Sequence, residues 1–196
     1  MALSPDVQER TDDARPSLEL ALSEAPDGRT RAMVWLLRAQ VEASQGRFDD
    51  AIEIADRVRA SIGPHPAIDR VRGNAAAQVW RWELAASAYG RAAEAAPLDT
   101  AAHRDHARAL GSLGRSREAW QAATRGLALF PRDEQLLRTQ ALALSALEDP
   151  RAEAAQQAYL QYRKPDDETT LRMRCDAVEP DCARDRLPIP TIELHP

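Results

Sequence analysis

The sequence repeats itself every 34 residues, and this period restricts the fold more than any other feature. In the aligned segments 32–65, 66–99 and 100–133 the twentieth position is always alanine, at Ala51, Ala85 and Ala119. Each segment closes with a proline at or next to its thirty-second position, at Pro64, Pro97 and Pro131. Self-similarity at such a period indicates a stacked array, in which each unit buries its apolar face against its neighbours.

Each unit is expected to be two antiparallel helices, because alanine, leucine and arginine dominate and β-branched residues are sparse. Small residues at the eighth position, Ala39, Gly73 and Ala107, allow the two helices of a unit to approach closely. The fifteenth position ends the first helix, where Gly46 and Gly114 accept the left-handed conformation of a helix C-terminus. The proline near the end of the unit stops the second helix.

This pattern resembles the tetratricopeptide repeat family, most clearly in segment 100–133. That segment has the family's signature residues at Ala107, Leu110, Gly114, Ala119, Ala123 and Pro131. The sequence departs from the family where Arg38, Arg72 and His106 replace its usual leucine. Trp80 likewise replaces its usual glycine. The resemblance implies an all-α fold, a right-handed α-solenoid of helix-turn-helix repeats.

The resemblance divides the chain into an N-terminal segment, an array and a C-terminal tail, at residues 1–31, 32–164 and 165–196. In the first part, 16–24 is expected to form a lone helix, half a repeat, that packs on the array. In the tail, Pro188, Pro190 and Pro196 rule out a closing helix. We expect the tail to cap the last repeat, because the terminal units of an array expose apolar surface.

The last unit of the array, 134–164, is a degenerate fourth repeat. It fits the period if one residue is inserted at the turn 148–150, next to Pro150. Ala154 and Ala158 then fall on family positions. The sequence therefore predicts three regular repeats and one irregular one.

In this family the first helices of successive repeats line a concave groove, which implies a set of groove residues in this chain. The set is Met33, Leu36, Gln40, Ser44, Arg70, Asn74, Gln78, Arg104, Arg108, Ser112, Gln135, Arg138 and Leu142. Arg70, Arg104 and Arg138, here called the groove arginines, recur at intervals of 34 residues. A column of like charges is costly unless an anion neutralises it, and guanidinium groups suit carboxylates.

The groove is therefore predicted to bind an acidic or carboxylate-bearing peptide, with Asn74 hydrogen bonding to its backbone. An alternative remains open for the groove arginines. In an arginine-rich chain they can fall in phase by chance and be neutralised by nearby acids, Asp69, Asp105 and Glu134.

Nothing in the sequence indicates an enzyme or a cofactor. His103 and His106 lie on one helical face but lack a nearby third ligand for a metal. No phosphate-binding glycine loop, nucleophile elbow or metalloprotease helix motif occurs. Packing explains most of the tryptophans, so an aromatic ligand cage is not expected.

The net charge of −5 argues against binding to nucleic acid or to membrane surfaces, and no apolar run is long enough to cross a membrane. The first residues lack the apolar stretch of a secretion signal, so the chain as written is expected to be cytoplasmic. Cys175 and Cys182 enclose six residues and can close as a disulfide. An oxidised pair would instead indicate a periplasmic or extracellular location, in a piece of an exported protein.

The function that these features favour is a non-enzymatic scaffold or adaptor, which binds a peptide or protein partner in the groove. The alternatives are a self-assembling or accessory domain of a larger exported or envelope protein, and a secretion-type chaperone. Size that depends on concentration would distinguish self-association from an adaptor, which stays small without its partner.

Overall fold

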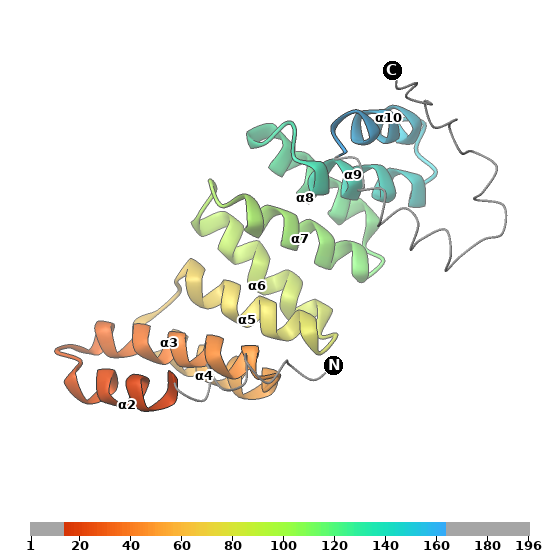
Figure 1. Cartoon of the computed structure of the whole chain (residues 1–196). Coiled ribbons are helices and arrows are strands. Elements are labelled where there is room, and N and C mark those ends of the chain that lie inside the picture. Colours follow the sequence, from red (N-terminus) through yellow and green to blue (C-terminus); the bar gives the residue numbers. More distant parts are fainter. Residues whose placement is uncertain (1–13, 164–196) are drawn as a thin grey trace, which may run out of the picture. The chain divides into compact units, whose positions relative to one another are not determined.

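The computed structural model describes residues 14–163, and every regular element within them is a helix. With the labels of Figure 1, the helices are α2 (Ala14–Glu24), α3 (Gly28–Ser44), α4 (Phe48–Ile62), α5 (Pro66–Gln78), α6 (Trp82–Ala95), α7 (Thr100–Ser112), α8 (Ser116–Leu129), α9 (Glu134–Ala146) and α10 (Ala152–Tyr162). The all-α fold is confirmed. The predicted tail and its cysteine pair, Cys175 and Cys182, lie outside the described residues.

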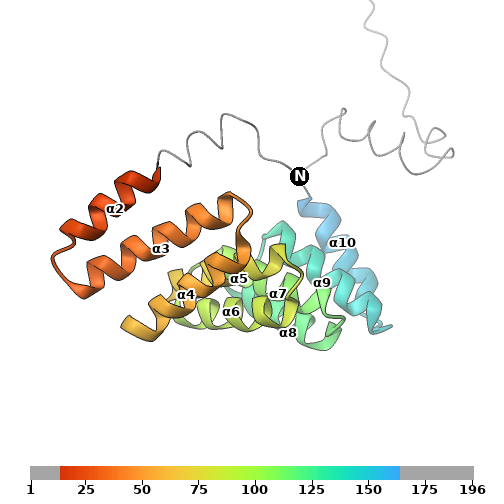
Figure 2. The same cartoon turned by 90° about the horizontal axis from the view of Figure 1, so that it is seen from below.

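The helices form four antiparallel pairs that follow the predicted repeats, preceded by α2, which packs on α3. Each helix packs on the next one along the chain, as Figures 1 and 2 show. Two further contacts join first helices of neighbouring pairs, α3 with α5 and α7 with α9. The helix expected at 16–24 is thus present as α2, slightly longer at its start.

Side-chain caps fix where the first helices begin. Asp99 accepts a hydrogen bond from the backbone N–H of Ala101 at 3.0 Å, and Asp133 accepts one from Leu136 at 3.1 Å. These carboxylates satisfy backbone donors that the first turn of a helix leaves without partners. At the start of α5, the imidazole of His65 accepts from the backbone N–H of Ala67 instead. The period therefore places an N-cap at the same point of each of these units.

Small side chains make up most of the core. Ala39, Ala51, Ala85, Ala107 and Ala119, at the eighth and twentieth repeat positions, are fully buried. This confirms that small residues there bring the two helices of a pair together.

The eighth position of the second repeat shows the closest of these contacts. A Cβ at Gly73 would lie 2.7 Å from Cε1 of Tyr89, so only glycine fits against that ring. Burial raises the pKa of Tyr89, and its hydroxyl donates a hydrogen bond to Oδ1 of Asn74 at 2.8 Å.

The turn inside each pair requires a positive φ at the fifteenth repeat position. Gly46 and Gly114 have φ of 80° and 70°, as predicted. Trp80 and Glu148 occupy the same position in the other two pairs, with φ of 61° and 52°. A side chain in this conformation costs about 1 kcal/mol. The indole of Trp80 is 77% exposed and packs edge-on against Trp82, with 5.9 Å between ring centroids.

The fourth pair corrects one expectation. A single inserted residue would place Ala154 in the core, but Ala154 is exposed and Ala155 is buried. The turn therefore carries two extra residues between Glu148 and the start of α10. Asp149 stabilises this longer turn by accepting hydrogen bonds from the backbone N–H of Arg151 at 3.0 Å and from its Nε at 2.7 Å.

The turn geometry generates a prediction. Gly114→Ala should lower the free energy of unfolding by about 1 kcal/mol, because alanine is strained at a positive φ. Gly111→Ala is the matched control: Gly111 lies in α7 without a positive φ, and no atom stands within 4 Å of its would-be Cβ. That control should gain about 0.5 kcal/mol of helix propensity. Urea denaturation measures both, and equal effects would contradict the assigned turn.

Candidate binding groove and the polar contacts around it

A pocket of about 840 Å³ lies between α7, the start of α8, and α9. Six predicted groove residues line it: Arg104, Arg108, Ser112, Gln135, Arg138 and Leu142. We call it the groove pocket. The structure thus brings together the groove positions of the third and fourth repeats. Their role in binding stays a prediction.

The remaining groove positions are dispersed. Gln40 and Ser44 line a separate pocket of about 540 Å³ between α2 and α3. On α5, Arg70, Asn74 and Gln78 are exposed but do not line the groove pocket. The first helices thus present predicted groove residues at more than one place.

The first repeat contains one error of prediction. Leu36 is 3% exposed and packs in the core, so it does not face a groove. Met33 on the same helix is 38% exposed, as a groove residue should be.

Two of the groove arginines are bound by the N-cap aspartates. Nη1 of Arg70 lies 3.0 Å from Oδ2 of Asp99, and Nε of Arg104 donates to Oδ2 of Asp133 at 2.7 Å. Each pair spans 29 residues and links the first helix of one pair to the start of the next first helix. The hydrogen bond to Asp133 raises the pKa of Arg104. Acids of the chain thus neutralise these two arginines, as in the alternative given above. The partners are Asp99 and Asp133, not the acids named from the sequence.

The groove pocket has two further arginines besides Arg104, and they differ in their partners. Arg108 pairs with Asp105 at 2.8 Å, one of the three acids named from the sequence. Arg138 lines the pocket and makes no hydrogen bond or ion pair with any residue in 14–163. Of the groove arginines in this part of the chain, Arg138 alone retains its full donor capacity.

Asn74 is partly engaged. Its side-chain oxygen accepts the hydroxyl of Tyr89, which leaves the amide N–H groups of this exposed residue for another acceptor. The predicted hydrogen bond from Asn74 to a peptide backbone is therefore compatible with the structure and stays a prediction.

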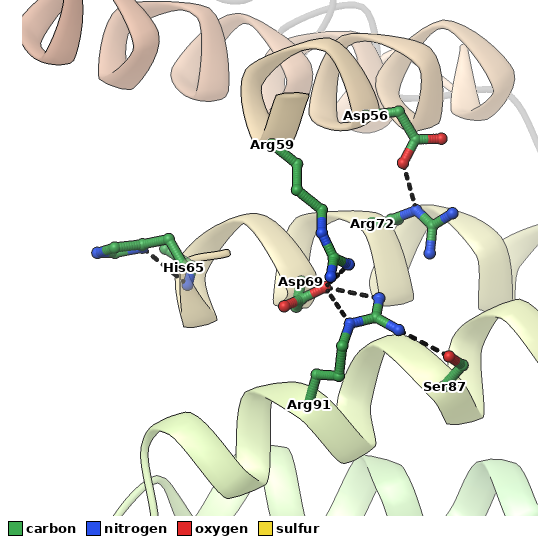
Figure 3. A network of polar contacts seen from close by, with 8 residues as sticks. Asp56, Arg59, His65, Asp69, Arg72, Ser87 and Arg91 are labelled. Atoms are coloured by element: carbon green, nitrogen blue, oxygen red, sulfur yellow. Dashed lines mark hydrogen bonds and ion pairs between the residues drawn. The ribbon is translucent and has the colours of Figure 1, made fainter. Parts of the chain in front are cut away.

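A buried carboxylate joins α4, α5 and α6. Asp69 is 2% exposed, and its Oδ1 accepts hydrogen bonds from Nη1 of Arg59 at 3.0 Å and from Nη2 of Arg91 at 2.7 Å (Figure 3). Nη1 of Arg91 also donates to the hydroxyl of Ser87 at 2.7 Å. A buried charge needs such partners, because its desolvation is otherwise too costly.

A second ion pair stands beside this carboxylate. Nε of Arg72 lies 2.6 Å from Oδ1 of Asp56, so α5 is linked to α4 there as well (Figure 3). This contact explains why the second repeat has arginine where leucine is usual. We call Asp56, Arg59, Asp69, Arg72, Ser87 and Arg91 together the ionic network. Sequence reasoning missed it, since Asp69 was considered only as a neighbour of Arg70.

The histidines of α7 show no metal-site geometry. No group of three or more His, Cys, Asp or Glu side chains that could hold an ion is found among residues 14–163. Burial lowers the pKa of His106 to about 4, and the positive charge of Arg125 adds to the shift. His106 is therefore neutral at physiological pH.

No helix in the described part of the chain is long and apolar enough to cross a membrane.

Comparison with known proteins agrees with the fold. No protein-family model and no curated protein sequence matches the chain. A structure of MamA has a TM-score of 0.68 at 16% identity, covering 80% of this chain and 85% of that one. A further MamA structure reaches 24% identity with a TM-score of 0.64, over 79% and 89% of the two chains.

A structure of YrrB, described as a TPR protein with an unusual peptide-binding site, has a TM-score of 0.68 at 15% identity. The match covers 86% of each chain. At these identities the likeness shows the fold alone. The expected tetratricopeptide-like array of helix pairs is thereby confirmed.

The double role of Asp133, cap and ion-pair partner, leads to a prediction about stability. Asp133→Ala should lower the free energy of unfolding by about 2–3 kcal/mol, since it removes both the cap of α9 and the partner of Arg104. Asp105→Ala, which breaks the more exposed pair with Arg108, should cost at most about 1 kcal/mol. Urea denaturation compares the two. Equal losses would show that the link to Arg104 adds nothing.

The buried imidazole leads to a prediction about pH. Because the folded-state pKa of His106 lies below its ordinary value of 6.5, the stability that depends on its neutral form is complete above pH 6.5 and is lost toward about pH 4. His106→Gln cannot titrate, so wild type should lose about 1 kcal/mol more than this variant over that range. Glutamine suits the site, as Gln140 holds the equivalent position one repeat later. The measurement is the free energy of unfolding as a function of pH. Parallel curves for wild type and His106→Gln would contradict the lowered pKa of His106.

Proposed function

We propose that this chain is a non-enzymatic adaptor, which holds a peptide segment of a protein partner in the groove pocket. The carrying observation is that six groove residues implied by the family resemblance line one pocket of about 840 Å³. Binding sites in proteins are commonly concavities of this size, with a few polar groups that orient the ligand.

The side chains of the groove pocket favour an acidic peptide. Arg138 has no partner within residues 14–163, so its guanidinium is available to bind a carboxylate in a bidentate way. Gln135 on α9 also lines the pocket and offers amide donors, whereas the hydroxyl of Thr139 already donates to the backbone oxygen of Gln135 at 2.9 Å. Leu142 is 60% exposed and offers an apolar contact one helical turn further on. We infer a ligand with an acidic residue beside an apolar one.

The comparison with YrrB supports this proposal at the level of the fold, because that protein is described as having a peptide-binding site. Folds of one kind carry many functions, so the argument depends on the residues of the pocket. Arg70 and Arg104 are less suited to bind a ligand than the sequence suggested, because each already neutralises an aspartate.

A charge-reversal experiment tests the groove pocket. The wild-type chain is applied to an array of random and acidic peptides. It should bind peptides that contain Asp or Glu, and this binding should be lost when that residue is changed to Asn or Gln. Arg138→Glu should weaken this binding at least about tenfold, since a hydrogen bond to a charged group contributes about 1.5–3 kcal/mol. Arg117→Glu is the control, because Arg117 on α8 is exposed and lies outside the groove pocket.

Equal peptide binding by Arg138→Glu and Arg117→Glu would show that the groove pocket is not the binding site. If no peptide binds and the mass measured by light scattering rises with concentration, the chain is a self-assembling domain and the adaptor is wrong.

A further inference from the structure

The four helix pairs of residues 14–163 meet at three junctions, and these junctions are filled differently. At the first, between the pairs α3–α4 and α5–α6, the ionic network occupies the space on the side of the second helices (Figure 3). Since the period is 34 residues, each member of this network has an equivalent 34 positions later. The three junctions can therefore be compared position by position.

At the second junction, between α5–α6 and α7–α8, the ionic network is not repeated. Asp56, Arg59, Asp69 and Arg72 are replaced by Gly90, Ala93, His103 and His106, while the equivalent of Arg91 is again an arginine, Arg125. These four replacements and Arg125 line a pocket of about 540 Å³, together with Glu94, Ala122 and Leu129. We call it the junction pocket. It lies where the first junction holds its buried carboxylate.

The third junction is closed by other means. Leu127 and Leu137 stand at the positions of Ala93 and His103 and contribute apolar volume to the interior. Gln140 donates a hydrogen bond from Nε2 to the hydroxyl of Thr124 at 3.1 Å. Thus two of the three junctions within residues 14–163 have contacts that fill this space, and the middle one has a pocket.

No side chain at the second junction takes the place of the Asp69 carboxylate. Nε2 of His103 lies 2.9 Å from the backbone oxygen of Pro97, and its ring packs against Phe130 with 6.0 Å between centroids. His106 is packed against Gly90, where an added Cβ would lie 3.1 Å from Nε2. Both imidazoles are therefore engaged at the walls of the junction pocket.

Arg125 is left with unused donors. Its equivalent, Arg91, donates from Nε and Nη2 to Asp69. Arg125 lines the junction pocket and has no hydrogen bond or ion pair with any residue of 14–163. The chain thus repeats the guanidinium half of a carboxylate-binding contact without repeating the carboxylate.

We propose that the junction pocket is a second binding site, which accepts a carboxylate side chain of a partner protein and binds it to Arg125 as Asp69 is bound to Arg91. Leu129 at this pocket is 47% exposed and supplies apolar contact surface. Glu94 also lines it and opposes a negative ligand. The site uses a different face of α7 from the groove pocket, since His103 and His106 line one and Arg104 and Arg108 line the other.

The test uses a blocked tripeptide, acetyl-Gly-Asp-Gly-amide, as the probe, with acetyl-Gly-Asn-Gly-amide as its neutral match. The imidazole C–H signals of His103 and His106 are followed by NMR during titration of the full chain. Saturable shifts are expected with the aspartate probe only. Arg125→Gln should weaken binding at least about tenfold, whereas Arg117→Gln should leave it unchanged. Glu94→Gln should tighten it.

A graft from the first junction provides an independent variant. His103→Asp places at the second junction the residue that the first junction has as Asp69. Its carboxylate should pair with Arg125 and exclude the probe while the helical fold is retained. The signals of His106 then report the titration. Binding that persists in Arg125→Gln, or shifts that do not saturate in wild type, would overturn the proposal. Arg138→Gln should bind the probe at the junction pocket as wild type does, which separates this site from the groove pocket.

Discussion

The structure depends on the close approach of helices whose contact residues are alanine and glycine. Because the side chains between them are small, little apolar area is buried per contact. The largest fully buried side chains in residues 14–163 are Tyr89, Ile68, Leu136 and the charged Asp69. Each helix pair therefore relies on its neighbours, as expected of an array whose stability is a sum of unit and interface terms. The polar contacts at the interfaces supplement this modest core.

Those polar contacts follow two rules. On the side of the first helices, Asp99 and Asp133 each cap a helix and bind an arginine of the preceding pair, so one carboxylate satisfies two needs. On the side of the second helices, the residues at equivalent positions change from ionic, to small residues with two histidines and one arginine, to apolar and amide. The first rule keeps the pairs in register, and the second makes each junction chemically distinct.

The period predicted the helices and turns because the same local requirement recurs in every unit. Trp80 shows its strength, since even a tryptophan adopts the positive φ that Gly46 and Gly114 have. The family resemblance, carried from repeat to repeat by the period, implied the groove positions, and six of them line the groove pocket. The value of the period ended where one unit departs from the others, as in the longer turn before Ala155.

The sequence pattern did not predict the polar contacts between helices. The partners of Asp69 are 10 and 22 residues away on two other helices, and those of Arg70 and Arg104 are 29 residues away. Such pairs depend on how neighbouring helices are rotated against each other, which a spacing rule does not supply. The burial of Leu36 was missed for the same reason, since the groove face was assigned by family position alone.

The second junction has a mechanical consequence. It is joined on one side by the ion pair of Arg70 with Asp99, while the ionic network that crosses the first junction is missing on its other side. The packing of α6 on α7 is retained along this side, so what is missing is the polar bridge and not the helix contact. The junction pocket is lined by residues of α6, α7 and α8. We therefore expect a group that wedges into it to act on this helix contact and to change the angle between the first two helix pairs and the last two.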